Sequence, residues 1–286
     1  GRRFKLVHVF NRSELIEVAT FRSGEDSSNN GNLVKDTSGK IIRDNIWGDL
    51  EQDTYRRDFT INALYYCPVS QKIVGHKDGM KHIHEKSIVS IGDPVKRFSE
   101  DPVRSLRAIR FSNKLNFKVD KDIKDAIYEK GHLLSDISNA RLFDEFCKIF
   151  LNGMAEKNFN KLSSFGLSKY LISTESERSV FTRNLIVESL RNTDKRLMNS
   201  QSITPGFLIA ALLWPELIGK SLSKGEINLR KFFRSMDYVL RNQQKITAVP
   251  RKFQSYIKDI RVLQLKLHSR IGKQPYKTLK HPRFRA

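Results

Sequence analysis

Apolar and polar residues alternate at the start of the chain, over residues 4–10 and again over residues 15–21. This period of two, in segments rich in Val, Ile and Phe, predicts two strands of a core, and the polar residues 11–14 predict the turn of a hairpin. Glu17 lies in the second strand on the face that also carries Leu15, Ala19 and Phe21. It is therefore either a satisfied glutamate at a sheet edge or a metal ligand.

From residue 120 onward the apolar positions follow the period of an α-helix. Residues 140–151 place five of them on one face: Leu142, Phe143, Phe146, Ile149 and Phe150. Asn152-Gly153 predicts the end of this helix, and residues 161–170, 178–191 and 205–214 continue the pattern. Such stripes indicate a packed helical core rather than a cofactor site.

Residues 22–44 follow neither period and are rich in Gly, Ser, Asn and Asp. A polar segment of this length is either a functional flap or disordered, and the sequence favours neither. A β-rich start followed by a helical remainder predicts an α+β fold.

The formal net charge is +21, from 52 Lys and Arg against 31 Asp and Glu. Such a chain attracts polyanions, which makes nucleic acid the leading partner and an anionic membrane surface the second. There is no run of 18 apolar residues, and the first residues have no signal-peptide core. We expect a cytoplasmic protein without membrane segments, and we expect residues before Gly1. The sequence points to no protein partner.

Cysteine and histidine spacing gives no metal motif. Cys67 and Cys147 are far apart among apolar neighbours, which predicts buried thiols rather than a disulfide or a zinc site. The seven histidines have no ligand spacing.

Residues 56–64, Arg-Arg-Asp-Phe-Thr-Ile-Asn-Ala-Leu, combine two guanidinium groups, a carboxylate and an amide. Asp58 is predicted to cap a helix in which Asn62 lies one turn on. Arginine forks suit the phosphates of a nucleoside triphosphate, and a carboxylate suits a ribose hydroxyl or metal-bound water. The alternative is a surface cluster of ion pairs at a helix start.

A second polar pattern begins at Asp101-Pro102, which predicts a helix N-terminus. Arg104, Arg107 and Arg110 recur every three residues beside an apolar stripe. This is either a solvated basic face or a binding surface. A carboxylate next to a guanidinium can match the N6 donor and N1 acceptor of adenine.

Three stretches resemble one family. Residues 56–63 resemble the motif R-R-D-F-T-x-N-A, residues 1–9 resemble G-R-R-F-x-L-x-H-V, and residues 100–111 resemble E-D-x-x-R-x-x-R-A-x-R-F. These motifs are typical of class II nucleotidyltransferases, the family of bacterial poly(A) polymerases and CCA-adding enzymes. The resemblance implies a partial, palm-like nucleotidyltransferase head over residues 1–90, a helical neck over 91–152, a helical body over 153–235 and a basic region over 236–286.

The resemblance also implies an activity. It is Mg²⁺-dependent transfer of AMP from ATP to the 3′ end of single-stranded RNA, with release of pyrophosphate. The alternatives are CCA addition or A addition to tRNA, and a non-catalytic RNA-binding derivative.

Residue roles follow from the same resemblance. Glu17 and Asp58 are the implied catalytic carboxylates, and Glu17 is a metal ligand. The implied nucleotide contacts are Arg56, Arg57, Asn62, Asp101, Arg104 and Arg107, of which Asp101 and Arg104 read adenine. Arg107 and Arg110 are assigned to phosphates or to packing of the neck.

Two departures from the family pattern stand out. No Asp-x-Asp pair precedes residue 22, and we reject Asp120-Lys121-Asp122 as a substitute because it lies at a polar helix start. One carboxylate cannot hold two Mg²⁺ ions, so residues 1–286 alone are expected to have little or no transfer activity. In place of the family pattern D-x-x-G-G-x-x-D-L, this chain has Gly75, Asp78 and His82 at the positions of Asp, Gly and Asp.

Residues 236–286 contain thirteen Lys or Arg and two acidic residues. Interleaved aromatic residues make this region suited to single-stranded RNA, with a solvated tail as the alternative. Apolar positions predict a folded helix here: Ile257, Ile260, Leu263 and Leu267. The region resembles the arginine-rich end of bacterial poly(A) polymerases, which implies RNA contacts for Arg251, Lys252 and Arg261. Arg110 of the 100–111 motif is a further expected RNA contact.

Overall fold

The computed structural model describes residues 6–12, 14–23, 34–35, 41–43, 47–173, 180–223, 225–267, 274–282 and 284. The chain forms two compact units. Unit 1 comprises residues 1–97 and 115–125, and unit 2 comprises residues 98–114 and 126–286. The finer division into four regions stays a prediction.

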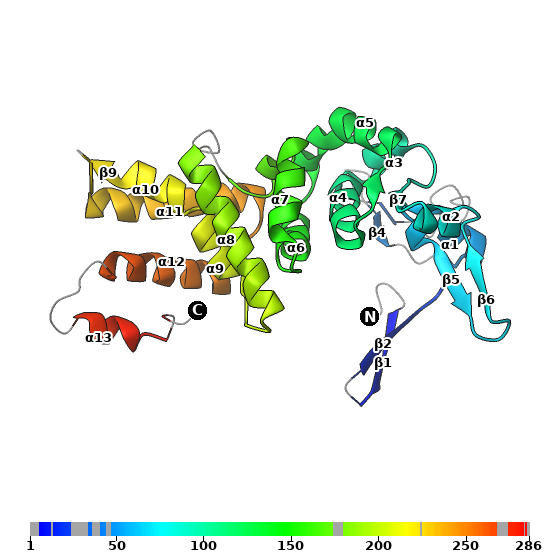
Figure 1. The fold of residues 1–286 in the computed structure, drawn as a ribbon, viewed down its shortest axis with the longest axis horizontal. Coiled ribbons are helices and arrows are strands. Elements are labelled where there is room, and N and C mark those ends of the chain that lie inside the picture. The colour runs from blue at the N-terminus through cyan, green and yellow to red at the C-terminus, as the bar shows by residue number, and fades with distance from the viewer. Residues whose placement is uncertain are drawn as a thin grey trace. The chain divides into compact units, whose positions relative to one another are not determined.

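Unit 1 begins with an antiparallel hairpin of β1 (Leu6–Asn11) and β2 (Glu14–Ala19), in which Glu17 lies opposite His8 (Figure 1). The predicted hairpin is confirmed. The predicted burial is wrong, because this is a two-stranded sheet whose strands expose both faces: Val7 is 59% and Phe10 77% exposed. Within residues 22–44, for which the sequence favoured neither a flap nor disorder, β3 (Val34–Lys35) pairs with β4 (Ile41–Arg43), and most of the remaining segment lies outside the described residues.

The rest of unit 1 alternates short helices and strands. They are α1 (Leu50–Tyr55), a 3-10 turn (Thr60–Asn62), β5 (Leu64–Cys67), β6 (Lys72–Gly75), α2 (Gly79–His84) and β7 (Ser87–Ile88), which pairs with β8 (Lys118–Val119). Leu64-Tyr65-Tyr66 pairs with β6 because this aromatic run favours a strand. Helices α3 (Pro94–Glu100) and α5 (Lys121–Lys130) each run from one unit into the other.

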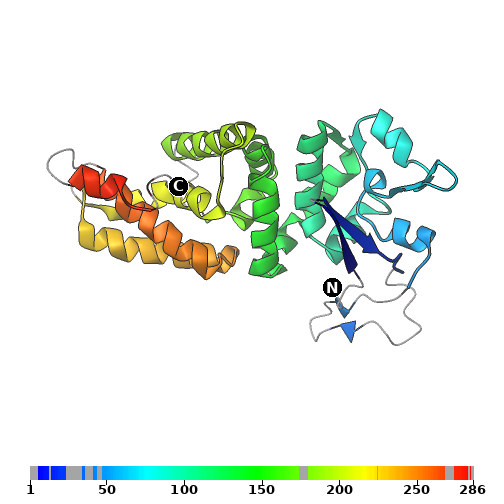
Figure 2. The same ribbon diagram turned by 90° about the horizontal axis from the view of Figure 1, so that it is seen from below.

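Unit 2 is helical, as predicted. It contains α4 (Val103–Leu115), α6 (Asn139–Phe150), α7 (Ala155–Ser164), α8 (Val180–Met198), α9 (Pro205–Leu212), α10 (Trp214–Ser221), α11 (Leu229–Ile246), α12 (Arg251–Lys266) and α13 (Gln274–Leu279). Its minor elements are 3-10 helices at Gly131–Asp136 and Ser168–Tyr170 and the strand pair β9 (Leu222–Ser223) and β10 (Glu226–Ile227). Helix α10 packs along α11, and α9 and α13 pack on α12 (Figures 1 and 2).

The periodic positions of unit 2 lie in its core. All five predicted residues of α6 are buried, as are Ile257, Ile260 and Leu263 of α12, whereas Leu267 follows α12 and is exposed. Both cysteines are free and half-buried, and burial raises the pKa of the Cys147 thiol to about 11. None of the helices in the described ranges combines the length and apolar character that crossing a bilayer requires.

The buried side-chain amide of Gln243 connects the end of α11 to the loop after the Ser168–Tyr170 turn by hydrogen bonds. Gln243 Nε2 donates to the carbonyl of Leu171 (2.9 Å) and to Thr247 Oγ1 (2.6 Å), and its Oε1 accepts from the amide of Ser173 (2.8 Å). The side chain is buried, so each of these groups depends on Gln243 for its hydrogen bond.

We predict that Gln243→Leu lowers the free energy of unfolding by about 3 kcal/mol, because it leaves buried polar groups unsatisfied. Urea unfolding measures this, with Gln201→Leu as the control, because Gln201 is exposed and its replacement should change stability by less than about 0.5 kcal/mol. Equal effects of the two substitutions would contradict the prediction.

Candidate functional site

The Arg56–Asn62 segment follows helix α1, whose start is fixed by a capping box. The side chain of Asp49 accepts from Gln52 N (2.8 Å), and Gln52 Oε1 accepts from Asp49 N (3.2 Å). The helix ends at Tyr55, so Arg56 and Arg57 lie at its C-terminus, where the helix dipole favours cations.

A buried carboxylate holds both arginines. Asp53 Oδ1 accepts from Arg56 Nε (2.8 Å), and Asp53 Oδ2 accepts from Arg57 Nη2 (2.9 Å) and from the hydroxyl of Tyr65 (2.6 Å). Burial raises the pKa of Asp53, but these hydrogen bonds outweigh it and bring the pKa down to about 2. The carboxylate is therefore ionised at neutral pH and fixes one edge of each guanidinium.

Asp53 was not among the site residues predicted from the sequence. The signal was present, because an aspartate three and four residues before two arginines can pair with both of them on a helix. The side chains of Arg56 and Arg57 remain 29% and 40% exposed. Arg57 also donates from Nη1 to the carbonyl of Asn62 (3.2 Å) and from Nε to the hydroxyl of Tyr65 (2.8 Å).

Arg97 of α3 orders the backbone of the same segment. Its Nη2 donates to the carbonyls of Arg56 (2.8 Å) and Arg57 (2.7 Å). These carbonyls follow the last residue of a short helix, and the guanidinium supplies a donor to both of them. Nothing in the sequence pattern around Arg97 indicated this role.

Asp58 and Asn62 lie together, as predicted. Asp58 is buried, and its Oδ1 accepts from Asn62 Nδ2 (3.0 Å) and from Phe59 N (2.9 Å). The predicted helix starting at Asp58 is wrong. Phe59 has an extended backbone and bridges to Ser90, which leaves only a 3-10 turn over Thr60–Asn62.

The backbone of this segment is anchored on both sides of Phe59. The amide of Ile91 donates to the carbonyl of Asp58 (3.1 Å), and the amide of Thr60 donates to the carbonyl of Val89 (3.1 Å). Phe59 itself is fully buried. Position 58 is therefore set by the core of unit 1 rather than by a surface helix.

The segment that departs from the family pattern packs against the same turn. Thr60 Oγ1 and His82 Nδ1 lie 2.8 Å apart in a hydrogen bond. A side chain at Gly79 would come within 2.9 Å of the carbonyl of Thr60, so α2 approaches the turn closely only because glycine starts it.

Glu17 is exposed on the hairpin, and its Oε1 lies 3.5 Å from His8 Nε2. In the described ranges, no group of three or more His, Cys, Asp or Glu side chains could hold a metal ion. Asp120 lies just before α5, and its Oδ2 accepts from Asp122 N (3.2 Å), so the polar helix start predicted at this position is confirmed.

In unit 2 the arginine helix α4 begins one residue later than predicted, at Val103. Asp101 Oδ1 accepts from Val103 N (3.2 Å), and Asp101 Oδ2 accepts from Arg141 Nη2 (2.7 Å). Arg104 pairs with Glu100 (3.1 Å). The two side chains expected to read a base therefore have protein partners, and sequence reasoning missed Arg141.

Arg107 and Arg110 both lie against Phe111. Their guanidinium carbons are 5.1 and 4.4 Å from the ring centroid, a cation–π geometry. This contact agrees with the packing role that we considered for both residues, and a phosphate role stays a prediction.

Three family descriptions match the chain. Residues 1–89 match "Poly A polymerase head domain", residues 116–174 match "Probable RNA and SrmB- binding site of polymerase A", and residues 224–286 match "Polymerase A arginine-rich C-terminus". Poly(A) polymerase I of Haemophilus influenzae is 40% identical over the whole chain, and that of Salmonella typhi is 36% identical. The chain belongs to the poly(A) polymerase family of nucleotidyltransferases. It spans 66% and 64% of the length of these two relatives.

CCA-adding enzymes are more distant members of this nucleotidyltransferase family. The enzyme of Lactococcus lactis subsp. lactis is 38% identical over 43% of this chain and 31% of its own length. A solved CCA-adding enzyme in an apo form matches with a TM-score of 0.65 at 20% identity, covering 98% of this chain and 61% of its own. This match confirms the predicted α+β nucleotidyltransferase fold.

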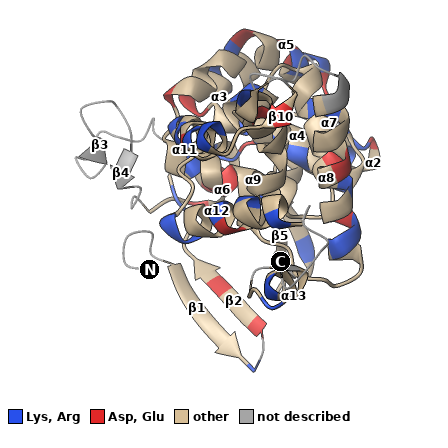
Figure 3. Ribbon diagram, turned by 90° about the vertical axis from the view of Figure 1, so that its left-hand side faces the viewer, with Lys and Arg blue, Asp and Glu red and all other residues tan. Residues whose placement is uncertain are grey.

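The arginine-rich region of this poly(A) polymerase family member only partly matches the predicted RNA surface. Arg251 and Lys252 are exposed at the start of α12, and Lys and Arg recur along α11 and α12 (Figure 3). Arg261 is fully buried, so the prediction that it contacts RNA from the surface is wrong. It lies one helical turn after buried Ile257 and shares its face. Tyr256 is buried too and cannot serve as an exposed platform.

We predict that Asp53→Asn lowers the free energy of unfolding by about 2 kcal/mol at pH 7, because it weakens a buried hydrogen-bonded ion pair. The folded-state pKa of about 2 lies below the ordinary 3.8, so this stabilisation is present above pH 4 and is lost as the pH falls toward 2. Denaturant unfolding at several pH values measures the difference, which should shrink with acidification. Glu51→Gln, exposed on the same helix, is the control.

Proposed function

We propose that the protein to which this chain belongs transfers AMP from ATP to RNA 3′ ends and releases pyrophosphate. The observation that carries this proposal is 40% identity to a poly(A) polymerase I along the whole chain, including the arginine-rich residues 224–286. A CCA-adding relative matches over 43% of the chain only.

The Arg56–Asn62 segment supports a site for the triphosphate. Asp53 holds the Nε edges of two guanidinium groups that remain charged and partly exposed. Fixed cations lose little conformational entropy when they bind phosphate oxygens. In this proposal Arg56 and Arg57 bind the triphosphate, and the Asp58–Asn62 pair binds the ribose side.

The described residues do not by themselves fit a two-metal centre. Glu17 is the carboxylate implied as a metal ligand, and no cluster of carboxylates surrounds it in the part of the chain that the structure describes. Two Mg²⁺ ions need several carboxylates. The requirement for Mg²⁺ therefore rests on the family resemblance.

Asp101 and Arg104 are proposed to select adenine. Asp101 Oδ2 already accepts from Arg141, which fixes the orientation of the carboxylate. A carboxylate held in this way can still accept a hydrogen bond from the amino group of adenine, because each of its oxygens has two lone pairs.

Product length separates this activity from its alternatives. The full-length protein, ATP and a generic RNA should give long A-tracts on a sequencing gel. Completion of tRNA ends with CTP and ATP would instead favour a CCA-adding enzyme. RNA binding with no nucleotide incorporation would favour a non-catalytic derivative.

We predict that Arg57→Lys in the full-length protein lowers kcat/KM for ATP by about tenfold or more, because lysine cannot reproduce the fork that bridges Asp53 and a phosphate. Steady-state AMP incorporation measures this. The control is Lys81→Ala, which removes an exposed cation of the same unit. An unchanged kcat/KM in the arginine variant would remove Arg57 from the triphosphate site.

We predict that replacing Arg251 and Lys252 by Gln reduces the salt dependence of single-stranded RNA binding. The slope of log K against log salt concentration should fall by about 0.7 for each RNA phosphate that the protein no longer neutralises. The affinity for single-stranded RNA can be measured by fluorescence anisotropy at salt concentrations from about 50 to about 300 mM. The control is Lys77→Gln, because Lys77 is exposed in unit 1. Equal slopes for the unsubstituted protein, the Arg251/Lys252 variant and the Lys77 variant would contradict the prediction that RNA binds at Arg251 and Lys252.

A further inference from the structure

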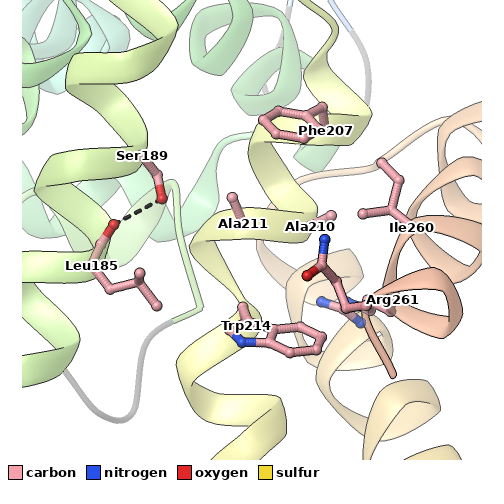
Figure 4. Close-up of a pocket in the computed structure, with 9 residues that line it drawn as sticks. Leu185, Ser189, Phe207, Ala210, Ala211, Trp214, Ile260 and Arg261 are labelled. Carbon is pink, nitrogen blue, oxygen red and sulfur yellow. Dashed lines mark hydrogen bonds between the residues drawn. The ribbon is translucent and has the colours of Figure 1, made fainter. Parts of the chain in front are cut away.

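Groups that could recognise an ionic ligand are distributed unevenly between the two units. Unit 2 contains a cavity of about 240 Å³ between α8, α9, α10 and α12 (Figure 4), with walls that include Leu185, Phe207, Trp214 and Ile260. Among the described residues that line it, only Arg261 is charged, and its Nε and Nη2 are shielded from solvent, so this cavity presents a mostly apolar surface. Unit 1 instead gathers ionised groups around one aromatic side chain, Tyr65.

The hydroxyl of Tyr65 lies between the cation and the anion of the arginine segment. It accepts from Arg57 Nε (2.8 Å) and donates to Asp53 Oδ2 (2.6 Å). The cation and the anion polarise the hydroxyl in the same direction, which strengthens both hydrogen bonds. Burial raises the pKa of Tyr65, and the hydrogen bond to Asp53 raises it further, so the hydroxyl keeps its proton at neutral pH and remains a donor.

The ring of Tyr65 supports the same guanidinium from a second direction. The guanidinium carbon of Arg57 lies over the ring, 5.1 Å from its centroid, in a cation–π contact. Nη2 donates to Asp53 Oδ2 (2.9 Å), and Nη1 donates to the carbonyl of Asn62 (3.2 Å). Each of Nη1 and Nη2 carries a second hydrogen, which can donate to a phosphate oxygen.

The position of Tyr65 is itself fixed by its neighbours. Tyr65 lies in β5 opposite Val74 of β6, and the ring of Phe21 meets its ring edge-on, with the centroids 5.6 Å apart. Gly75, one of the departures from the family pattern, lies against the same ring. A Cβ at Gly75 would lie 3.1 Å from Tyr65 Cδ2 and 2.2 Å from the carbonyl oxygen of Ala63. Glycine at position 75 therefore lets β6 pass close beside the Tyr65 ring.

We propose that Tyr65 is a positioning residue for the triphosphate of ATP, because it orients Arg57 so that Nη1 and Nη2 are presented to the phosphates. This inference rests on the proposed function. Tyr65 acts through Arg57 and does not itself touch the nucleotide. The adjacent Tyr66 offers a matched comparison, because it is 63% exposed and lies opposite Ile73 in the same hairpin.

The test is Tyr65→Phe in the full-length protein, which keeps the ring and removes the hydroxyl. The KM for ATP should rise about tenfold while kcat changes by less than about twofold, because the lost contact orients a group that binds the ground state and the transition state alike. Binding of inorganic tripolyphosphate, measured by calorimetry, should weaken by a similar factor. The inhibition constant of adenosine should not change, because adenosine has no phosphate. Tyr66→Phe, the control, should change none of these quantities.

A double variant separates positioning from a general structural role. In a protein that carries Arg57→Lys, adding Tyr65→Phe should have no further effect on tripolyphosphate binding, because Tyr65 acts through Arg57. Additive losses would overturn the proposal, as would unchanged tripolyphosphate binding in Tyr65→Phe or an equal weakening of tripolyphosphate and adenosine. Calorimetry requires no turnover, so it tests Tyr65 independently. Failure of the unsubstituted protein to incorporate AMP would contradict the proposed function alone.

Discussion

The candidate site depends on the ion pairs of the buried Asp53 carboxylate with Arg56 and Arg57. Two arginines placed side by side repel each other, and an exposed pair would sample many rotamers. Asp53 accepts from both guanidinium groups and from Tyr65, which removes the repulsion and fixes one edge of each fork. The cations that remain accessible are therefore oriented before any polyanion arrives.

The surrounding structure of unit 1 keeps this carboxylate and its arginines in register. The capping box starts α1 at a defined residue, Arg97 satisfies the carbonyls at its end, and the backbone of Asp58 and Thr60 is bonded to residues 89–91. Each contact acts on backbone or on a buried group, so the geometry is maintained by the core rather than by surface ion pairs. Such preorganisation is what a triphosphate site requires.

Sequence patterns predicted the helices of unit 2 and the amphipathic face of α6 because one long apolar stripe determines them. Short elements were harder to predict. The turn after Asp58 became a 3-10 helix because a tertiary bridge through Phe59 overrode its local capping signal. The role of Arg97 and the burial of Arg261 depend on contacts 40 and 25 residues away along the chain, which a local pattern cannot contain. The motif around Arg56 identified the family, but the residue that orders it, Asp53, lies outside that motif.

In the proposed function, Arg56 and Arg57, held by Asp53, bind the triphosphate of ATP. The most direct measurement is the NMR chemical shift of the two arginine Nε–H groups in the full-length protein during titrations with ATP and with adenosine. Both resonances should move with ATP and stay in place with adenosine, because adenosine has no phosphate. Resonances that do not respond to ATP, or that respond equally to adenosine, would contradict the account.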